Sequence, residues 1–503
     1  MKTTIYYKTL PLYKGDAILS ATGIPVTPPI GSCNAKRNAG MDPICLGRPA
    51  KLRKLEDEAE KEELLWLCPS SVKSNRTGLK NSVQRIIQPI IDGIKLGSQR
   101  TDKKDPISLA SADSSFAHVP PCTKAIEAIV QAVVRKPHTT GYTHACGSPE
   151  SRCAIASHHS SPEHQLSPEH VIVTNGCSGA LELSLESLLD PGTTLLVPQP
   201  GLPLYEEISA SIGANVIRYR LDPHQGWECD MNHLEEIMTS KNGNTCCRAI
   251  RAMVITNPST HGSVFSETHL TQILGFALKY RIPIISDEVY GDLTFGSNRF
   301  HPMARLAAVH GRKVPIITTS GFSKQFLVPG WRIGWVAFQD NSYGSLREVE
   351  KGARRLANLQ HGVSHLQQSV IPALLSVSTT PGLARWKEDF RNVLKSQATL
   401  LCSKLMNECH CLDIRSPPQG SMYAIVHLDL DCLDETIQDD MDFVRLLVRE
   451  ENVFVLPGSS FGVPGTFRVA YSSCERILEM ASQRIINFCH RHRREKRRAH
   501  CNQ

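Results

Sequence analysis

A lysine and an arginine eight positions apart carry the most specific chemistry in this sequence. Lys324 follows an apolar, β-branched run at 314–319, which predicts a buried strand. Among small and apolar neighbours a lysine loses hydration, and this favours the neutral amine that attacks a carbonyl. The planar guanidinium of Arg332 suits a phosphate or carboxylate. Together they indicate a Schiff base to a phosphate-bearing aldehyde, namely pyridoxal phosphate; on composition alone a solvated surface lysine is the simpler interpretation.

An acidic residue closes a second apolar strand, at 281–287. Burial of Asp287 is costly unless a cation meets it, and the pyridinium nitrogen of the cofactor is such a cation. By holding that proton, Asp287 would keep the ring an electron sink. Tyr290 can donate to the phenolic oxygen of the ring. A helix cap is the alternative for Asp287 alone, but Lys324 lies 37 residues downstream (324 − 287), strand end to strand end, and favours the cofactor.

Two further patterns indicate anion sites. A strand, tight turn and helix at 171–185 put Gly176, Cys177 and Ser178 at a helix N-terminus, where free N–H groups and the dipole favour an anion. Arg468 lies inside an apolar strand and needs an anionic partner, either a substrate carboxylate or an internal salt bridge. Strands and helices alternate from 120 to about 340, which predicts a parallel sheet covered on both faces, with ligands at the strand ends.

Composition excludes several classes of protein. The 503 residues are 41% hydrophobic and 21% charged, as in soluble globular enzymes. The net charge of +7 is concentrated at 490–500, so the body is nearly neutral and no nucleic-acid partner is expected. The 17 cysteines lack metal-site spacing, and we expect no metal. No signal peptide or 18-residue apolar run occurs; we expect no membrane partner and a cytoplasmic rather than mitochondrial location.

The segment Gly-Phe-Ser-Lys at 321–324, followed by Val-Pro-Gly-Trp-Arg-x-Gly-Trp at 328–335, resembles the cofactor-lysine segment of the tyrosine aminotransferase family. That family belongs to the fold-type I, class I/II pyridoxal-phosphate-dependent aminotransferases, and the order of motifs matches over roughly 80 to 485. The resemblance implies an α/β fold: a large domain with a mostly parallel, seven-stranded-type sheet and a smaller α+β domain. We therefore expect an N-terminal extension of unknown role (1–78), an N-terminal part of the small domain with an interface helix (79–120), the large cofactor domain (121–345), an interdomain helix with the C-terminal small domain (346–488) and a basic tail (489–503).

The resemblance also implies a set of site residues. It gives Lys324, Asp287 and Tyr290 the catalytic roles. The residues implied around the cofactor are Gly176, Cys177, Ser178, Leu202, Asn257, Ser323 and Arg332, with Tyr142 reaching the phosphate of a neighbouring subunit in a homodimer. Those implied around the substrate are Arg468 on the α-carboxylate, Asn257, and Ala112 in place of a usual glycine.

Two departures from the family pattern affect these expectations. Leu202 stands where an aromatic residue usually stacks on the pyridine ring, and losing that geometry costs roughly 0.5–1.5 kcal/mol unless Tyr205 lies closer to the site. Ala112 adds a methyl group beside the substrate carboxylate.

The expected function is transfer of the amino group of an L-amino acid, aromatic and tyrosine-like, to a 2-oxo acid such as 2-oxoglutarate by a ping-pong mechanism. An enzyme specific for a dicarboxylate would use a second arginine. Arg354 and Arg355 lie in the region expected for it, and the sequence does not fix which of the two faces the site. Two alternatives stay open: a related lyase similar to aminocyclopropane-carboxylate synthase, and a non-enzymatic scaffold of the same fold.

Overall fold

The computed structural model describes residues 71–76, 104–110, 122–135, 137–240, 250–341, 344–375 and 382–494. All of them lie in one compact unit, Ser70–Gln503. Four predictions lie outside the described residues: Ala112, most of the N-terminal extension, the interface helix expected within 79–120, and the end of the basic tail. The boundaries proposed for the domains stay predictions.

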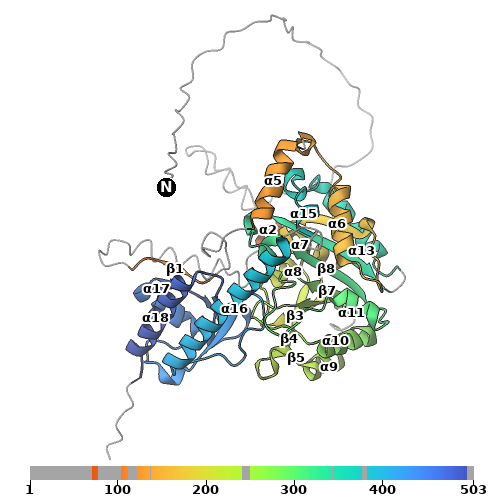
Figure 1. The fold of residues 1–503 in the computed structure, drawn as a ribbon. Helices are drawn as coiled ribbons and strands as arrows, with labels where there is room; N and C mark the ends of the chain where they lie inside the picture. Colours follow the sequence, from red (N-terminus) through yellow and green to blue (C-terminus); the bar gives the residue numbers. More distant parts are fainter. Residues whose placement is uncertain are drawn as a thin grey trace, which may run out of the picture. The chain divides into compact units, whose positions relative to one another are not determined.

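The fold is built around a mixed sheet of eight strands (Figure 1). In spatial order these are β2 (Val171–Asn175), β9 (Ile333–Asp340), β8 (Pro315–Gly321), β7 (Ile284–Asp287), β6 (Ile250–Thr256), β3 (Thr194–Gln199), β4 (Asn215–Asp222) and β5 (Glu228–Cys229). The five strands from β8 to β4 are parallel, as the alternating pattern predicts. The eighth strand, β5, is a two-residue antiparallel addition at the edge that the sequence did not indicate.

Apolar strands form this sheet because both of its faces are covered. Neighbouring residues of one strand point to opposite faces, so Ile284 joins one core cluster and Ile285 another. The first cluster packs against α9 (Met231–Thr239), α10 (Glu267–Tyr280) and α11 (Met303–Val309). The second packs against α7 (Gly176–Leu188), α8 (Leu204–Ile212) and α13 (Arg347–Leu359). The strand ends are thereby fixed between two helical layers.

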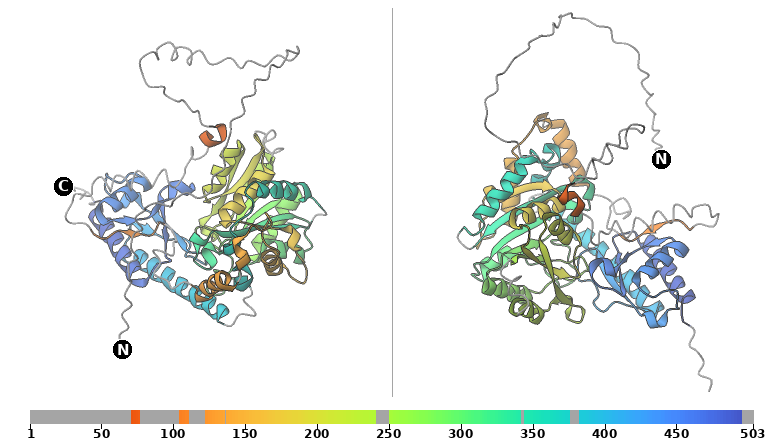
Figure 2. Two further views of the ribbon diagram at one scale, coloured as in Figure 1. Left: turned by 90° about the horizontal axis from the view of Figure 1, so that it is seen from above. Right: turned by 180° about the vertical axis from the view of Figure 1, so that it is seen from behind.

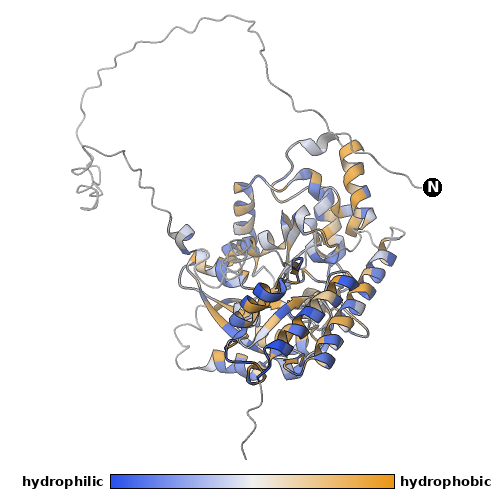
Figure 3. Ribbon diagram, turned by 90° about the vertical axis from the view of Figure 1, so that its left-hand side faces the viewer, coloured by the Kyte–Doolittle hydropathy of each residue, from blue (hydrophilic) through white to orange (hydrophobic). Residues whose placement is uncertain are grey.

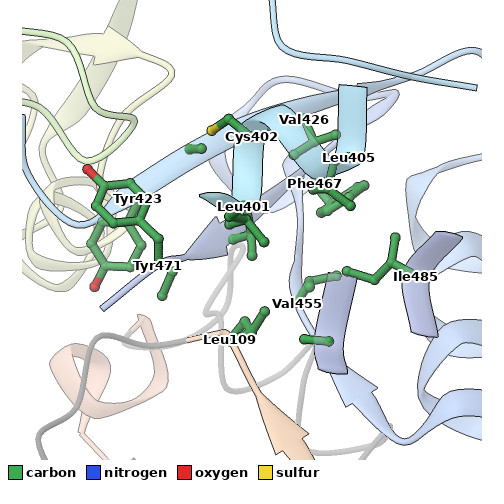
Figure 4. Packing of buried hydrophobic residues seen from close by; sticks show 14 of the residues in the cluster. Leu109, Leu401, Cys402, Leu405, Tyr423, Val426, Val455, Phe467, Tyr471 and Ile485 are labelled. Atoms are coloured by element: carbon green, nitrogen blue, oxygen red, sulfur yellow. The ribbon is translucent and has the colours of Figure 1, made fainter. Parts of the chain in front are cut away.

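The C-terminal part of the chain has a core of its own (Figure 4). Its antiparallel sheet has the order β10 (Leu412–Asp413), β11 (Tyr423–Leu428), β14 (Thr466–Ala470) and β13 (Leu456–Pro457). The helices α16 (Leu383–Glu408), α17 (Asp440–Glu451) and α18 (Glu475–Arg491) pack against it. The short strand β1 (Ile107–Ser108) pairs in parallel with β12 (Val453–Phe454), so the segment at 104–110 joins this C-terminal part (Figure 2).

The alternation of strands and helices expected from residue 120 begins with the helix α5 (Thr123–Arg135). The region that follows β9 is helical and is divided into α13, α14 (His365–Gln368), α15 (Ile371–Leu375) and α16. The first division falls at His361 and Gly362, whose φ angles of 53° and 86° are left-handed and end α13. The remaining described helices are α2 (Val72–Arg76), α6 (Pro149–His159) and α12 (Phe322–Gln325).

Among the described helices, none is long and apolar enough to cross a bilayer. Within the same residues no group of three or more His, Cys, Asp or Glu side chains is arranged to hold a metal ion.

A buried carboxyl ties the end of β7 to the start of α11. Glu288 is 3% exposed, and its Oε1 accepts hydrogen bonds from the Ser286 hydroxyl at 2.8 Å and the Met303 N–H at 3.1 Å. Burial raises the pKa of Glu288 to about 7, and these two hydrogen bonds only partly oppose that effect. The folded protein therefore binds this proton more tightly than the unfolded chain does.

This difference predicts a pH-dependent stability. The stabilisation by the bound proton is complete below the ordinary glutamate pKa of 4.5 and is lost as the pH rises through about 7. The loss is about 3 kcal/mol for the wild type, whereas Glu288→Gln, which cannot ionise, is expected to lack it. Urea unfolding between pH 5 and pH 8 measures the effect. The exposed Glu388→Gln is the matched control; a wild-type pH slope that persists in Glu288→Gln would contradict the assignment.

Candidate active site

Three of the predicted site residues lie at the same edge of the large sheet. Asn257 follows β6, Asp287 ends β7, and Lys324 lies in α12, directly after β8. These strands are parallel neighbours, with Asp287 level with Thr256 on one side and Thr319 on the other. Carboxyl ends of parallel strands form the usual ligand-binding edge of an open α/β sheet.

The carboxylate of Asp287 is buried at the base of this edge, with 1% of its surface exposed. Its Oδ2 accepts a 2.6 Å hydrogen bond from the Tyr205 hydroxyl, and its Oδ1 accepts from the Val289 N–H at 3.3 Å and the Cys177 thiol at 3.5 Å. Burial raises the pKa of Asp287, while these hydrogen bonds lower it. Within the described part of the chain no basic side chain lies within 4.0 Å of this carboxylate, so a cation from outside the chain would complete the site.

A donor without a partner lies on the neighbouring strand end. The Oδ1 of Asn257 accepts a 2.9 Å hydrogen bond from the Phe265 N–H, which fixes the orientation of the amide. Its buried Nδ2 has no hydrogen-bond partner among the described residues. Since an unpaired buried donor is costly, this nitrogen is available for a ligand oxygen.

The turn before α7 and the residue before β9 form a cradle for an anion. Arg332 Nη2 donates to the Ser178 hydroxyl at 2.7 Å and to the Asn175 carbonyl at 3.0 Å. Gly176 has a φ of 72°, and a Cβ atom there would lie 2.4 Å from Arg332 Nη2. The guanidinium and the Ser178 hydroxyl therefore converge at the N-terminus of α7, as a phosphate requires, while the Gly176 N–H donates to the Arg332 carbonyl at 3.0 Å.

The second arginine of the predicted site lies on the C-terminal sheet. Arg468 in β14 is 8% exposed, and its Cζ lies 4.1 Å from the ring centroid of Tyr423 and 4.4 Å from that of Phe461. No carboxylate in the described residues forms a salt bridge with it, and its buried Nε has no hydrogen-bond partner there. The internal salt bridge that we considered is therefore not found in this part of the chain.

Tyr423, which packs against Arg468, also contacts Lys324. The Lys324 Nζ lies 3.4 Å from the Tyr423 hydroxyl. The ring of Tyr290 meets that of Tyr423 edge-on, with centroids 6.3 Å apart. Burial first, and then the neighbouring phenol of Tyr423, raise the pKa of Tyr290 well above its ordinary value. A neutral phenol can donate a hydrogen bond, which is the role predicted for Tyr290.

The remaining predicted residues make fewer contacts with the site residues described so far. Ser323 is buried in the same helical turn as Lys324. Leu202 lines a small cavity together with Phe461. Tyr142 is 95% exposed, and the nearest ring is that of His361, with centroids 6.4 Å apart. Its predicted role in another subunit stays a prediction.

The expectation of a second substrate arginine at Arg354 is not supported. Its Nε and Nη2 donate to Glu350 Oε1 at 3.1 and 2.7 Å, and it lines a separate cavity with His170 and Lys351. Arg355 is exposed on the same helix, α13. An i,i+4 acidic partner in the sequence was the available signal that Arg354 is occupied.

Sequence reasoning missed three residues beside the site. Tyr423 and Phe461 are described above, and the third is His261 in the loop after β6. Burial first, and then the charge of Arg468, lower the pKa of His261 to about 3, so its imidazole is neutral at physiological pH. Its ring packs 5.1 Å from that of Trp227.

Comparison with known proteins identifies the family of the chain. The family model "Aminotransferase class I and II" matches residues 104–485. Tyrosine aminotransferase of Dictyostelium discoideum is 34% identical over 86% of this chain and 98% of its own length. The crystal structure of tyrosine aminotransferase from Leishmania infantum matches with a TM-score of 0.74 and 28% identity, over 86% of this chain and 100% of that one. An S-alkyl-thiohydroximate lyase of Arabidopsis thaliana is 32% identical over 74% of this chain and 77% of its length.

The chain therefore belongs to the aminotransferase class I and II family of fold-type I enzymes, and within it to the tyrosine aminotransferase family. It is an aminotransferase, and its family depends on pyridoxal phosphate. The unpaired Asn257 amide, the buried Asp287 carboxylate and the anion cradle at Arg332 fit that group.

The cradle predicts a specific glycine requirement. In Gly176→Ala, the added Cβ would meet the Arg332 guanidinium from a strained left-handed backbone, so we expect pyridoxal phosphate to bind about 10–100-fold more weakly. Gly179→Ala, in the same helix, meets no atom closer than 3.6 Å and is the matched control. Equilibrium dialysis of each variant measures the affinity. Equal affinities for the two variants would rule out the cradle as the phosphate site.

Proposed function

We propose that this aminotransferase moves the amino group of an aromatic, tyrosine-like L-amino acid to a 2-oxo acid such as 2-oxoglutarate, by a ping-pong mechanism. The observation that carries the proposal is the pairing of two strand ends. The buried carboxylate of Asp287 meets no cation in the described residues, and Lys324 stands at the end of the adjacent strand. An acid and an amine at the ends of adjacent strands suit the ring nitrogen and the aldehyde carbon of pyridoxal phosphate.

Pyridoxal phosphate, when bound, supplies a ring that withdraws electrons from the α-carbon of the substrate. The chain would hold it at five points. The residues that would do so are Asp287 at the ring nitrogen, Asn257 and Tyr290 at the phenolic oxygen, Leu202 over the ring face, Lys324 at the aldehyde carbon, and Gly176, Cys177, Ser178, Ser323 and Arg332 around the phosphate. The contact of Tyr205 with Asp287 orients the carboxylate, and it opposes the rise in pKa that burial causes.

The substrate would be held from the C-terminal sheet. The Arg468 guanidinium forks onto the α-carboxylate, because no carboxylate in the described residues occupies it. The Lys324 amine then takes the α-proton and returns it to the cofactor side, acting first as base and then as acid. Ala112, which lies outside the described residues, would border the same carboxylate. In the second half of the cycle the oxo acid binds in the same way, so the two substrates share one site.

Two observations favour aromatic substrates. The aromatic rings of Tyr423 and Phe461 flank Arg468, and such rings pack well against an aromatic side chain. The tyrosine aminotransferase of Dictyostelium discoideum is 34% identical to this chain. Leu202 in place of a stacking aromatic residue would weaken the hold on the cofactor by roughly 0.5–1.5 kcal/mol.

A lyase reaction is the second candidate, because a relative of similar identity bears the name of a lyase. The product distinguishes the two: release of a 2-oxo acid that requires an added oxo-acid acceptor is transamination. A non-enzymatic scaffold would neither be coloured as purified nor take up added cofactor.

Lys324→Ala is expected to lower turnover of tyrosine with 2-oxoglutarate by at least about 100-fold while the fold stays intact, because the general base is lost. Borohydride treatment of the wild type should attach the cofactor covalently to Lys324, as peptide mass analysis would detect. Lys279→Ala removes an exposed lysine that pairs with Glu235 and is the control. Near-normal turnover by Lys324→Ala would show that another group is the base.

We further propose that two copies of the chain form a homodimer through α5. The ribbon of this helix carries much of the apolar colour in Figure 3. Four of its residues recur at helical spacing and are 43–72% exposed, which gives an apolar stripe: Ile126, Val130, Val133 and Val134. Tyr142, 95% exposed, follows the same helix in the chain. A second copy seated on the stripe would cover it and receive Tyr142 at its phosphate. The free thiols of the described cysteines favour a reducing compartment, for which we propose the cytoplasm.

The double variant Val130→Asp, Val134→Asp is expected to be monomeric, because two carboxylates would be buried in an apolar contact. Val309→Asp introduces a carboxylate at a site 52% exposed on α11, away from the stripe, and should leave the dimer unchanged. Sedimentation velocity distinguishes the two states. A double variant that remains dimeric would place the interface elsewhere.

A further inference from the structure

We propose that Tyr423 is a further catalytic residue, whose hydroxyl holds the Lys324 amine and whose ring holds the Arg468 guanidinium. The proposal rests on the proposed function and adds to it a residue that links the base to the carboxylate clamp. Neither the motifs nor the resemblance indicated this position.

The pairing of two strands places Tyr423 beside Arg468. Tyr423 begins β11, and Ile425, two residues on, lies directly opposite Arg468 in β14. Residues two apart on a strand share a face, so Tyr423 and Arg468 are diagonal neighbours on one face of the antiparallel pair. The 4.1 Å between the guanidinium carbon and the ring centroid is a close cation–π contact. The ring therefore fixes the position of the guanidinium.

The hydroxyl of Tyr423 points from this sheet toward the strand ends of the large sheet. Its side chain is 3% exposed, and the hydroxyl lies 3.4 Å from Lys324 Nζ. In Figure 4 the phenolic oxygens of Tyr423 and Tyr471 point to the same side, away from the packed Leu401 and Val426. The Tyr471 hydroxyl is used differently, because it donates to the Gly420 carbonyl at 2.7 Å. Of these two phenols, Tyr423 is therefore the one that contacts the lysine among the described residues.

A phenol suits a lysine that must change its protonation state. The hydroxyl accepts a hydrogen bond from the ammonium and donates one to the lone pair of the neutral amine, so it holds the nitrogen in both states. The α-proton moves from the substrate carbon to the Lys324 nitrogen and then to the accepting carbon, while Tyr423 keeps its own proton. Since the same residue supports Arg468, the distance between the base and the bound carboxylate is set by one side chain.

The test compares Tyr423→Phe with Tyr471→Phe in the cofactor-loaded enzyme. Tyr423→Phe keeps the ring and loses the hydroxyl, so kcat should fall roughly 10–100-fold with KM unchanged for both substrates. Tyr423→Leu, which also loses the ring, should in addition raise KM for the amino acid and the oxo acid alike. Tyr471→Phe loses an equally buried hydroxyl and should keep its kcat. Equal kcat values for Tyr423→Phe and the wild type, or an equal fall in both phenylalanine variants, would overturn the proposal.

A second measurement does not depend on turnover. In the full-length protein freed of cofactor, acetic anhydride labels the neutral form of Lys324, and peptide mass analysis gives the extent of labelling as a function of pH. Tyr423→Phe removes an acceptor from the protonated amine, so the midpoint of labelling should move to lower pH, and Tyr471→Phe should leave it in place. An unmoved midpoint would remove the contact. If the wild type neither turns over substrate nor binds cofactor, the proposed function fails instead, and the labelling result then decides only whether Tyr423 contacts Lys324.

Discussion

A buried carboxylate with no cation beside it in the described residues is the constraint on which this site depends. Asp287 ends a wholly apolar strand, and a charge in that position is costly unless it is hydrogen-bonded and neutralised. The chain supplies the hydrogen bonds through Tyr205 and the Val289 N–H. It leaves the opposite charge to a ligand. Helices cover both faces of the large sheet, and at this edge they keep water away from that acid.

A second unpaired charge lies on the other core. Arg468 is flanked by the rings of Tyr423 and Phe461 rather than by an acid, and His261 beside it is neutral. Aromatic faces tolerate a guanidinium without consuming its N–H donors. Those donors remain available for a carboxylate from solution. The large sheet thus provides a buried acid, Asp287, and the C-terminal sheet a buried base, Arg468. Neither is paired with an opposite charge among the described residues, so each is available to a ligand group.

Much of this arrangement was readable from the sequence, because strand ends follow from apolar runs and parallel strands bring their ends together. The positions of Asp287 and Lys324 could be predicted on that basis. Tyr423 could not, because its contacts depend on the register between β11 and β14, which one sequence does not reveal. The occupation of Arg354 by Glu350 was missed for another reason: a local ion pair competes with a distant role, and spacing alone does not decide between them.

The anion cradle links binding of the cofactor to the stability of the fold. Arg332 and Ser178 are 154 residues apart in the chain and meet only after β9 has paired with β2. An unfolded chain therefore has no such grip on a phosphate ester, and the ester binds the native form alone. By mass action the cofactor then stabilises the native state. Each tenfold rise in its free concentration above the dissociation constant adds about 1.4 kcal/mol to the free energy of unfolding, and so protects the chain from proteolysis.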